Sequence, residues 1–197
     1  MNTERFNRQL DFLIEIDKVK HILRNTILMD ASRKENDAEH SWHLALAALV
    51  LQEYLDEQNI DLTKVLQMVL IHDLVEIDAG DAFAYGNIDW EQQSQQEKLA
   101  AERIFGLLPL GQKQEFFDLW SEFEAAQTGE ARYAKALDSF LPILHNYRTQ
   151  GLQWQRLGVT REQVLNRNRR IEKASKQLWA YIVDLVDEAV AKGYLHP

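Results

Sequence analysis

Hydrophobic residues along this chain recur at intervals of three and four positions, which is the spacing of one face of an α-helix. Residues 4–23 place their apolar side chains on one such stripe, and a second helix is predicted over residues 37–58. Within it, segment 42–51 is apolar on nearly every side, and such a helix is expected to be buried all round. No segment alternates polar and apolar residues for long. The pattern therefore predicts an all-α helical bundle.

Further helices are predicted by the same spacing over residues 62–75, 89–105, 110–126, 130–150 and 160–192, the last in one or two pieces, and Asp89 resembles the N-cap of the helix over 89–105. Residues 24–37 are polar and mixed, and are predicted to form a connecting loop. Residues 77–90 hold two glycines and three aspartates, and are predicted to be a second loop. Loops of this length are often functional. Without internal repeats or linkers, residues 1–197 are expected to form a single domain, with helices 151–197 packed on a core at about 5–150.

Composition narrows the class of protein. The chain has 197 residues, of which 46% are hydrophobic and 27% charged, as in ordinary globular proteins. It contains no cysteine, so a metal would need histidine and carboxylate ligands. The N-terminal residues lack a signal peptide's apolar region, and no apolar run is long enough to span a bilayer, so a cytoplasmic location is expected. A net charge of −9 argues against binding to a nucleic acid polymer.

The candidate chemistry centres on His72-Asp73, which lies in the otherwise apolar run 69–75. Burying two such hydrated side chains is costly unless something coordinates them. Together with His40 and Asp138 they form a plausible four-ligand site for a divalent ion such as Mn, Co, Fe, Zn, Ni or Mg. A six-coordinate ion would keep two positions for water and a substrate oxygen. Taken singly, a buried histidine is more often a hydrogen-bonded core residue, and Asp138 more often a cap or a solvated side chain.

Other residues near this set suggest supporting roles. Glu76 follows Asp73 by three positions on the same helix face, and could orient the attacking water or carry a proton. Asp81 could hydrogen-bond a substrate hydroxyl. His43 is predicted to be a core or partner-stacked histidine rather than a further ligand. His145 lies about 10 Å along the helix axis from Asp138, too far to reach the same ion easily.

These residues and their flanks resemble the HD-domain metal-dependent phosphohydrolases, whose signature is His … His-Asp … Asp on an all-α bundle. Segments 35–41, 72–81 and 135–138 are similar to the branch containing bacterial 5′-deoxynucleotidases. The resemblance covers about residues 5–150. It implies a homodimer with one divalent metal that hydrolyses nucleoside 5′-monophosphates to nucleoside and phosphate.

The same resemblance implies roles for single residues. Glu76 would be the acid or base, and Asp81 would contact the sugar. Arg24 or Arg33 would hold the phosphate, since a guanidinium fork suits phosphate oxygens. In the deoxynucleotidases this arginine precedes a tryptophan, whereas here Asn25 follows Arg24, so the sugar preference stays open.

Other functions remain compatible with the sequence. No histidine occurs between residues 72 and 145, which favours a single metal ion over a two-metal site. One alternative is another HD-type phosphodiesterase acting on a small nucleotide. The other is a non-catalytic helical module that keeps the metal as a structural element.

Overall fold

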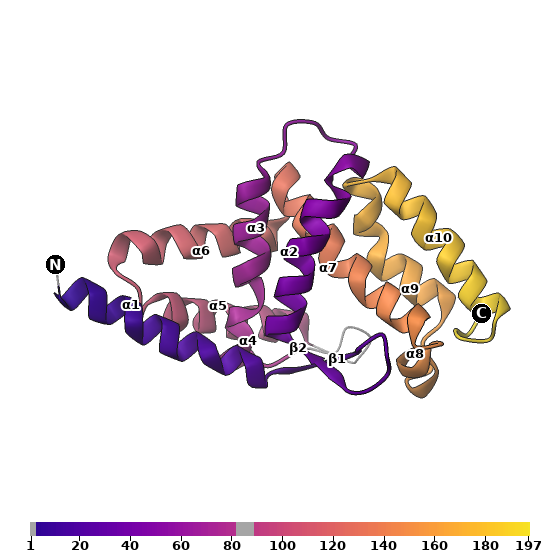
Figure 1. Ribbon diagram of the computed structural model, residues 1–197, viewed down its shortest axis with the longest axis horizontal. Coiled ribbons are helices and arrows are strands. Elements are labelled where there is room, and N and C mark those ends of the chain that lie inside the picture. The colour runs from indigo at the N-terminus through magenta and orange to yellow at the C-terminus, as the bar shows by residue number, and fades with distance from the viewer. Residues whose placement is uncertain (1–2, 82–88) are drawn as a thin grey trace.

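The computed structural model describes residues 3–81 and 89–197, and its regular structure is almost entirely helical (Figure 1). The α-helices are α1 Thr3–Ile16, α2 Asp37–Leu51, α3 Leu62–Ile71, α4 Glu76–Ala79, α5 Trp90–Phe105, α6 Leu110–Ala125, α7 Gly129–Arg148, α8 Leu152–Arg156, α9 Arg161–Asn168 and α10 Lys176–Ala191. Helices α2, α3 and α7 occupy the middle, with α1, α5 and α6 on one side and α8, α9 and α10 on the other. The all-α prediction is confirmed.

The segment predicted as a loop over residues 24–37 is instead a small antiparallel hairpin. Strand β1, Leu23–Ile27, pairs with β2, Lys34–Asn36. The expectation of a loop was wrong because two strands this short show no clear alternation, and contacts with α2, α7 and α8 support the pairing. The hairpin carries Arg24 and Glu35, so it contributes side chains to the middle of the protein.

Helix ends follow local capping chemistry. The Asn36 side chain accepts from the backbone N–H of Glu39, whose carboxylate accepts from that of Asn36, which starts α2 with a capping box. The Asp89 side chain caps α5 by accepting from two backbone N–H groups, as its sequence position predicts. The predicted helix 160–192 is two helices, α9 and α10, separated by the 3₁₀ turn Arg169–Lys173. Likewise, α3 ends at Ile71 and continues as the 3₁₀ turn His72–Val75.

Two groups of buried side chains hold these helices together. The larger group joins α2, α3, α7 and the C-terminal helices, and contains Leu137, which is fully buried. Within it, the hydroxyl of Tyr133 donates to the backbone oxygen of Ala48 across 3.0 Å, linking α7 to α2. The smaller group joins α1, α5, α6 and the turn after α3. Because α2, α3 and α7 pack on one another, polar residues at their neighbouring ends are brought together.

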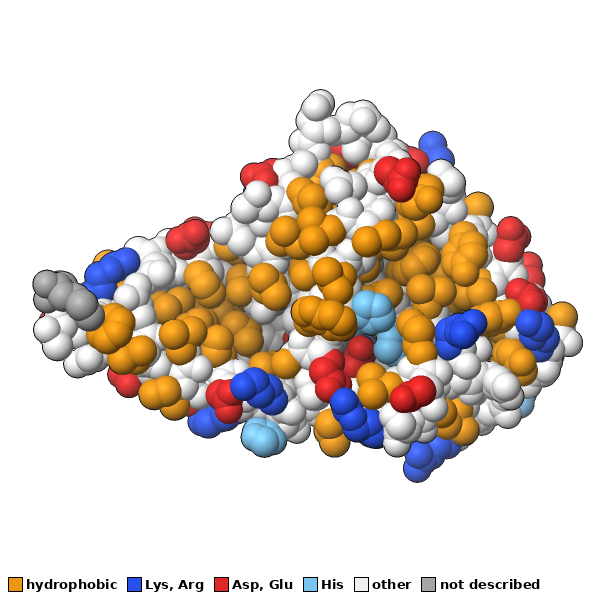
Figure 2. All heavy atoms as spheres, in the orientation of Figure 1, with side chains coloured by type: hydrophobic (Ala, Val, Ile, Leu, Met, Phe, Trp, Pro, Cys, Tyr) orange, Lys and Arg blue, Asp and Glu red, His pale blue; other side chains and the backbone are white. Residues whose placement is uncertain are grey.

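Helix α2 is not buried on every side, contrary to the expectation from its composition. Trp42 is 63% exposed and Val50 66% exposed, while Leu44 is fully buried. Helical periodicity explains the difference, since α2 packs on α3 and α7 with one face only. Figure 2 shows hydrophobic side chains gathered in a broad band over α2 and its neighbours. The packing of α2 therefore leaves part of its apolar surface in contact with solvent.

None of the helices in the described part of the chain combines the length and the apolar character needed to cross a bilayer.

Candidate metal centre

The four predicted metal ligands come from three helices that meet in the core. His40 lies in the first turns of α2, His72 and Asp73 in the 3₁₀ turn after α3, and Asp138 in α7. His40 Nε2 lies 3.1 Å from Asp138 Oδ1, and His72 Nε2 lies 3.0 Å from Asp73 Oδ1. His72 Nε2 is also 3.9 Å from Asp138 Oδ1. One ligand atom each of His40, His72 and Asp73 lies within 4.8 Å of the others. The structure therefore brings residues separated by about a hundred positions to one point.

The hydrogen bonding of His72 leaves its inner nitrogen ready to bind an ion. Its Nδ1 faces the carbonyl oxygen of Val69 at 2.9 Å, and because a carbonyl only accepts, Nδ1 carries the proton. The lone pair of Nε2 then points at the carboxylates of Asp73 and Asp138. This Nε2 is buried and has no hydrogen-bond partner among the described residues. A backbone bond that fixes the tautomer in this way is typical of metal-ligating histidines.

The charges around His40 and Asp138 also favour a cation. Burial and Arg24 disfavour the imidazolium, but the carboxylates of Asp138 and Glu35 outweigh them and raise the pKa of His40 to about 9. Burial likewise opposes ionisation of Asp138, yet the hydrogen bond and charge of His40, with the charge of Arg24, hold the pKa of its carboxyl well below its usual range. A proton thus occupies the histidine where a metal would replace it. The donor set, two imidazoles and two carboxylates, fits one divalent ion.

Three more acids crowd the same place. Asp37 is fully buried at the start of α2, and Asp37, Asp73 and Glu76 form a second group of ligand-type atoms within 4.8 Å of one another. Burial, with the charge of Asp73 beside it, raises the pKa of Asp37 to about 7. Burial and the neighbouring carboxylates also raise the pKa of Glu76 well above its usual value. The acidic side chains at this site thus carry more negative charge than the neighbouring basic side chains neutralise. A bound cation would neutralise the remainder.

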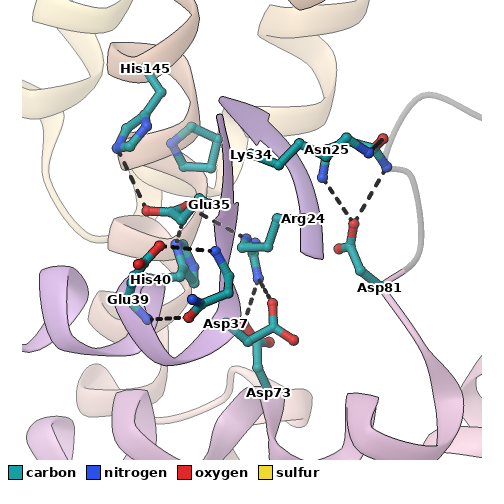
Figure 3. Close-up of polar contacts among 12 residues, drawn as sticks. Arg24, Asn25, Lys34, Glu35, Asp37, Glu39, His40, Asp73, Asp81 and His145 are labelled. Carbon is teal, nitrogen blue, oxygen red and sulfur yellow. Dashed lines mark hydrogen bonds and ion pairs between the residues drawn. The ribbon is translucent and has the colours of Figure 1, made fainter. Parts of the chain in front are cut away.

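Arg24 is the cation at the centre of these acids (Figure 3). From β1, its Nη1 approaches Asp73 Oδ2 at 2.5 Å and Asp37 Oδ1 at 3.4 Å, while Nη2 lies 3.8 Å from Asp138 Oδ1. Burial disfavours the charge, but Asp73 and Asp138 raise the pKa of Arg24 above its usual value. The structure does not bring Arg33 to this site. Its side chain is 53% exposed and pairs with Glu39 at 2.6 Å.

Glu76 and Asp81 both line the same cavity. Glu76 begins α4, and its Oε2 is buried without a hydrogen-bond partner among the described residues. Asp81 Oδ2 accepts from the backbone N–H of Asn25 at 3.2 Å and from the Asn25 amide at 3.4 Å (Figure 3). Burial raises the pKa of Asp81. The rest of the loop predicted over residues 77–90, from 82 to 88, lies outside the described residues.

The cavity has a volume of about 700 Å³, within the range of small-molecule sites. Arg24, His72, Asp73 and Asp138 form part of its wall. Other parts of the wall carry aromatic and basic side chains, including Trp90, Trp154, Arg132, Lys135, Arg167, Arg170 and Lys173. Together with Arg24, these basic residues equal in number the six acids among the described residues of the same wall, whereas acids outnumber bases in the chain as a whole.

Sequence reasoning gave no role to several residues of this site. Glu35 and Asp37 were seen only as the flank of His40, and Trp90 only as part of a helix start. The density of acids over residues 35–39, directly before a buried helix, was the available signal for the first two. Trp90 and the basic residues of α9 and of the 3₁₀ turn after it carry no local signal, since their approach to the cavity depends on how distant helices pack.

Known proteins resemble this chain over most of its length. A family model described as HD domain matches residues 16–179. Human 5′-deoxynucleotidase HDDC2 is 30% identical over 136 residues, which are 68% of this chain and 65% of the human protein. The Xenopus laevis protein of the same name is 29% identical over 75% of this chain and 70% of its own length. A crystal structure of a predicted metal-dependent phosphohydrolase from Magnetospirillum magnetotacticum MS-1 matches with a TM-score of 0.94 and 52% identity, covering 98% of this chain and 97% of that one.

Proposed function

The chain belongs to the HD domain family, and we propose that it is a metal-dependent phosphomonoesterase that hydrolyses nucleoside 5′-monophosphates, including deoxynucleotides, to nucleoside and phosphate. The observation that carries this proposal is the arrangement around Arg24. Its guanidinium meets the carboxylates of Asp73 and Asp138, which are proposed metal ligands, at the wall of a nucleotide-sized cavity. A phosphate placed there would contact the arginine and the ion together.

We propose that His40, His72, Asp73 and Asp138 hold the ion, whose identity the donor set leaves among Mn, Co, Fe, Zn, Ni and Mg. A bound dication lowers the pKa of water and neutralises phosphate charge. Arg24 binds and orients the phosphate through its fork of N–H donors. Glu76, whose Oε2 has no partner among the described residues, orients the attacking water or carries a proton to the leaving 5′ oxygen.

The nucleoside would occupy the remainder of the cavity. Asp81, held by Asn25, is placed to accept a hydrogen bond from a sugar hydroxyl. Trp90, at the start of α5, is 49% exposed and lines the cavity, so its ring offers a stacking surface for a base. The guanidinium of Arg167 lies 5.1 Å from the centre of that ring and orients it. In this arrangement Trp90 contacts the nucleoside, and no tryptophan directly after Arg24 is needed for that contact.

We also propose that two copies associate through the exposed face of α2. Trp42, Leu46 and Val50 line an apolar groove with Tyr181 of α10. The second copy would cover this apolar surface in water. Val50→Glu should convert dimer to monomer in sedimentation velocity, while Gln58→Glu, a matched charge change on the chain between α2 and α3, should not. A monomeric wild-type protein at micromolar concentration would rule the dimer out.

The decisive experiment measures phosphate release from a panel of ribo- and deoxyribonucleoside monophosphates, with Mn²⁺, Co²⁺, Fe²⁺, Zn²⁺, Ni²⁺ or Mg²⁺ added in turn. We expect turnover with at least one ion, and its loss together with bound metal in His72→Ala. A metal-loaded protein that releases no phosphate from any monophosphate contradicts the proposal. Cyclic nucleotides are assayed in parallel by chromatography of the nucleoside monophosphate that their hydrolysis would form. Hydrolysis of cyclic nucleotides alone would identify a phosphodiesterase, and no hydrolysis at all would identify a structural metal module.

A further inference from the structure

A second cluster of metal-binding side chains lies beside the first one and uses none of its proposed ligands. It consists of Glu35 on β2, His43 on α2 and His145 near the end of α7. One ligand atom of each lies within 4.8 Å of the others. Glu35 is 2% exposed and His145 is 3% exposed, whereas His43 is half-buried. Two of the three possible ligands are therefore buried polar groups. Glu35 Oε2 already has His40 and Arg24 beside it, at 3.4 and 3.8 Å, so the buried atom of this cluster that still needs a partner among the described residues is Nε2 of His145.

The hydrogen bonding of His145 leaves one of its two ring nitrogens facing a carboxylate. Its Nδ1 faces the carbonyl oxygen of Ile27 in β1 at 3.0 Å, so Nδ1 carries the proton and donates it there. The lone pair of Nε2 then points toward Glu35 Oε1, 3.8 Å away. This Nε2 has no hydrogen-bond partner in the described part of the chain. An imidazole lone pair and a carboxylate repel each other in a buried site unless a positive charge lies between them.

The position of His43 adds a third donor to this pair. Its ring centre is 5.6 Å from that of His145, and the two rings are tilted by 57°. The residue sits one helical turn after His40 on α2, which turns its side chain to the same general side of the helix. Figure 3 shows Glu35 between His145 above it and His40 below it.

We propose that Glu35, His43 and His145 form a second divalent-cation site, distinct from the one built on His72 and Asp73, and that it takes Zn²⁺. Two imidazoles and one carboxylate, with water as a fourth ligand, are a frequent zinc donor set in proteins. The two carboxylate oxygens of Glu35 face different histidines. Oε1 faces His145, while Oε2 faces His40 Nδ1 at 3.4 Å.

An ion here would tie the hairpin to two core helices. Glu35 belongs to β2, and the carbonyl that orients His145 belongs to β1, the strand that carries Arg24. The ion would join this hairpin to α2 through His43 and to α7 through His145. Its contribution is therefore to stability and to the position of Arg24, and it needs no contact with the substrate.

The test counts metal ions in the full-length protein. After saturation with Zn²⁺ and removal of free ion, elemental analysis should find two zinc equivalents per chain in the wild type. His145→Gln and His43→Gln should each hold one, and His72→Ala should also lose one. In His145→Gln, zinc should no longer raise the melting temperature by as much as in the wild type. The control is His21→Gln, which changes an exposed histidine and should keep both equivalents.

A zinc content that is the same in the wild type, His145→Gln and His43→Gln overturns the proposal, whether or not the first site also takes zinc. Circular dichroism and sedimentation check that each variant is folded and associated like the wild type. Since His145 is buried and His43 is half-buried, the second variant keeps the test decisive if the first one does not fold. Metal counting also separates this proposal from the catalytic one, because a second zinc site can exist whether or not the protein hydrolyses nucleotides.

Discussion

Replacing Arg24 with methionine tests the electrostatics of the site most directly, because methionine keeps much of the side chain's length and removes its charge. At an effective dielectric constant of about 20, a charge pair at the 2.5 Å that separates Arg24 from Asp73 attracts by about 7 kcal/mol. The 3.4 Å contact with Asp37 contributes about 5 kcal/mol on the same scale. The cost of burying the guanidinium offsets much of this gross attraction.

The net effect of losing one member of a buried ion pair is about 3–5 kcal/mol. Here protonation of Asp37, whose pKa is about 7, relieves part of the repulsion among the remaining acids. We therefore expect the lower end, a loss of about 3 kcal/mol in the free energy of unfolding without metal. For a chain of this length, that corresponds to a fall in melting temperature of about 6–12 °C. Saturating Mn²⁺ should restore part of the loss, because a dication neutralises the same carboxylates.

Urea unfolding followed by circular dichroism, in chelator and in excess Mn²⁺, measures the effect. Arg33→Met is the matched control, since Arg33 pairs with Glu39 at the surface and such pairs contribute about 0–1 kcal/mol. In phosphate-release assays, Arg24→Lys should lower kcat/KM by about 100- to 1,000-fold, because a point charge replaces a two-pronged donor. Equal stability and equal kcat/KM for the Arg24 and Arg33 variants would refute the reasoning.

Three further perturbations address catalysis, recognition and packing. Glu76→Gln should lower kcat by about 100- to 10,000-fold while elemental analysis finds unchanged metal content; loss of the metal would show that Glu76 is a ligand instead. Trp90→Ala should raise KM for nucleotides about tenfold or more through lost stacking, and leave KM for a phosphate ester without a base unchanged; equal effects on both substrates would contradict stacking. Leu137→Ala, in the core of α7, should lower the free energy of unfolding by about 2–5 kcal/mol in urea titrations, and a change under 1 kcal/mol would contradict its burial.

Local properties of the chain were readable from sequence because they depend on near neighbours. The helical spacing of apolar residues predicted an all-α fold, and Asp89 predicted the start of α5, since capping involves residues two and three positions away. The position of His72-Asp73 in an apolar run indicated a buried polar pair, and the structure places both side chains in the interior.

Other features depend on contacts that no local pattern records. In the sequence, Arg24 and Arg33 were equal candidates to hold the phosphate. The hairpin places only Arg24 among the acids, because β1 lies against α7 and α8. The composition of α2 predicted burial on all sides, but its packing partners cover a single face, which leaves Trp42 and Val50 exposed. His145 looked too distant from Asp138 to share an ion, and the structure gives it Glu35 and His43 instead. The sequence by itself determined which segments are helical and indicated that His72 and Asp73 are buried. Tertiary packing alone decided which polar groups meet, because interactions between charges depend on their distance in space and not on their separation along the chain.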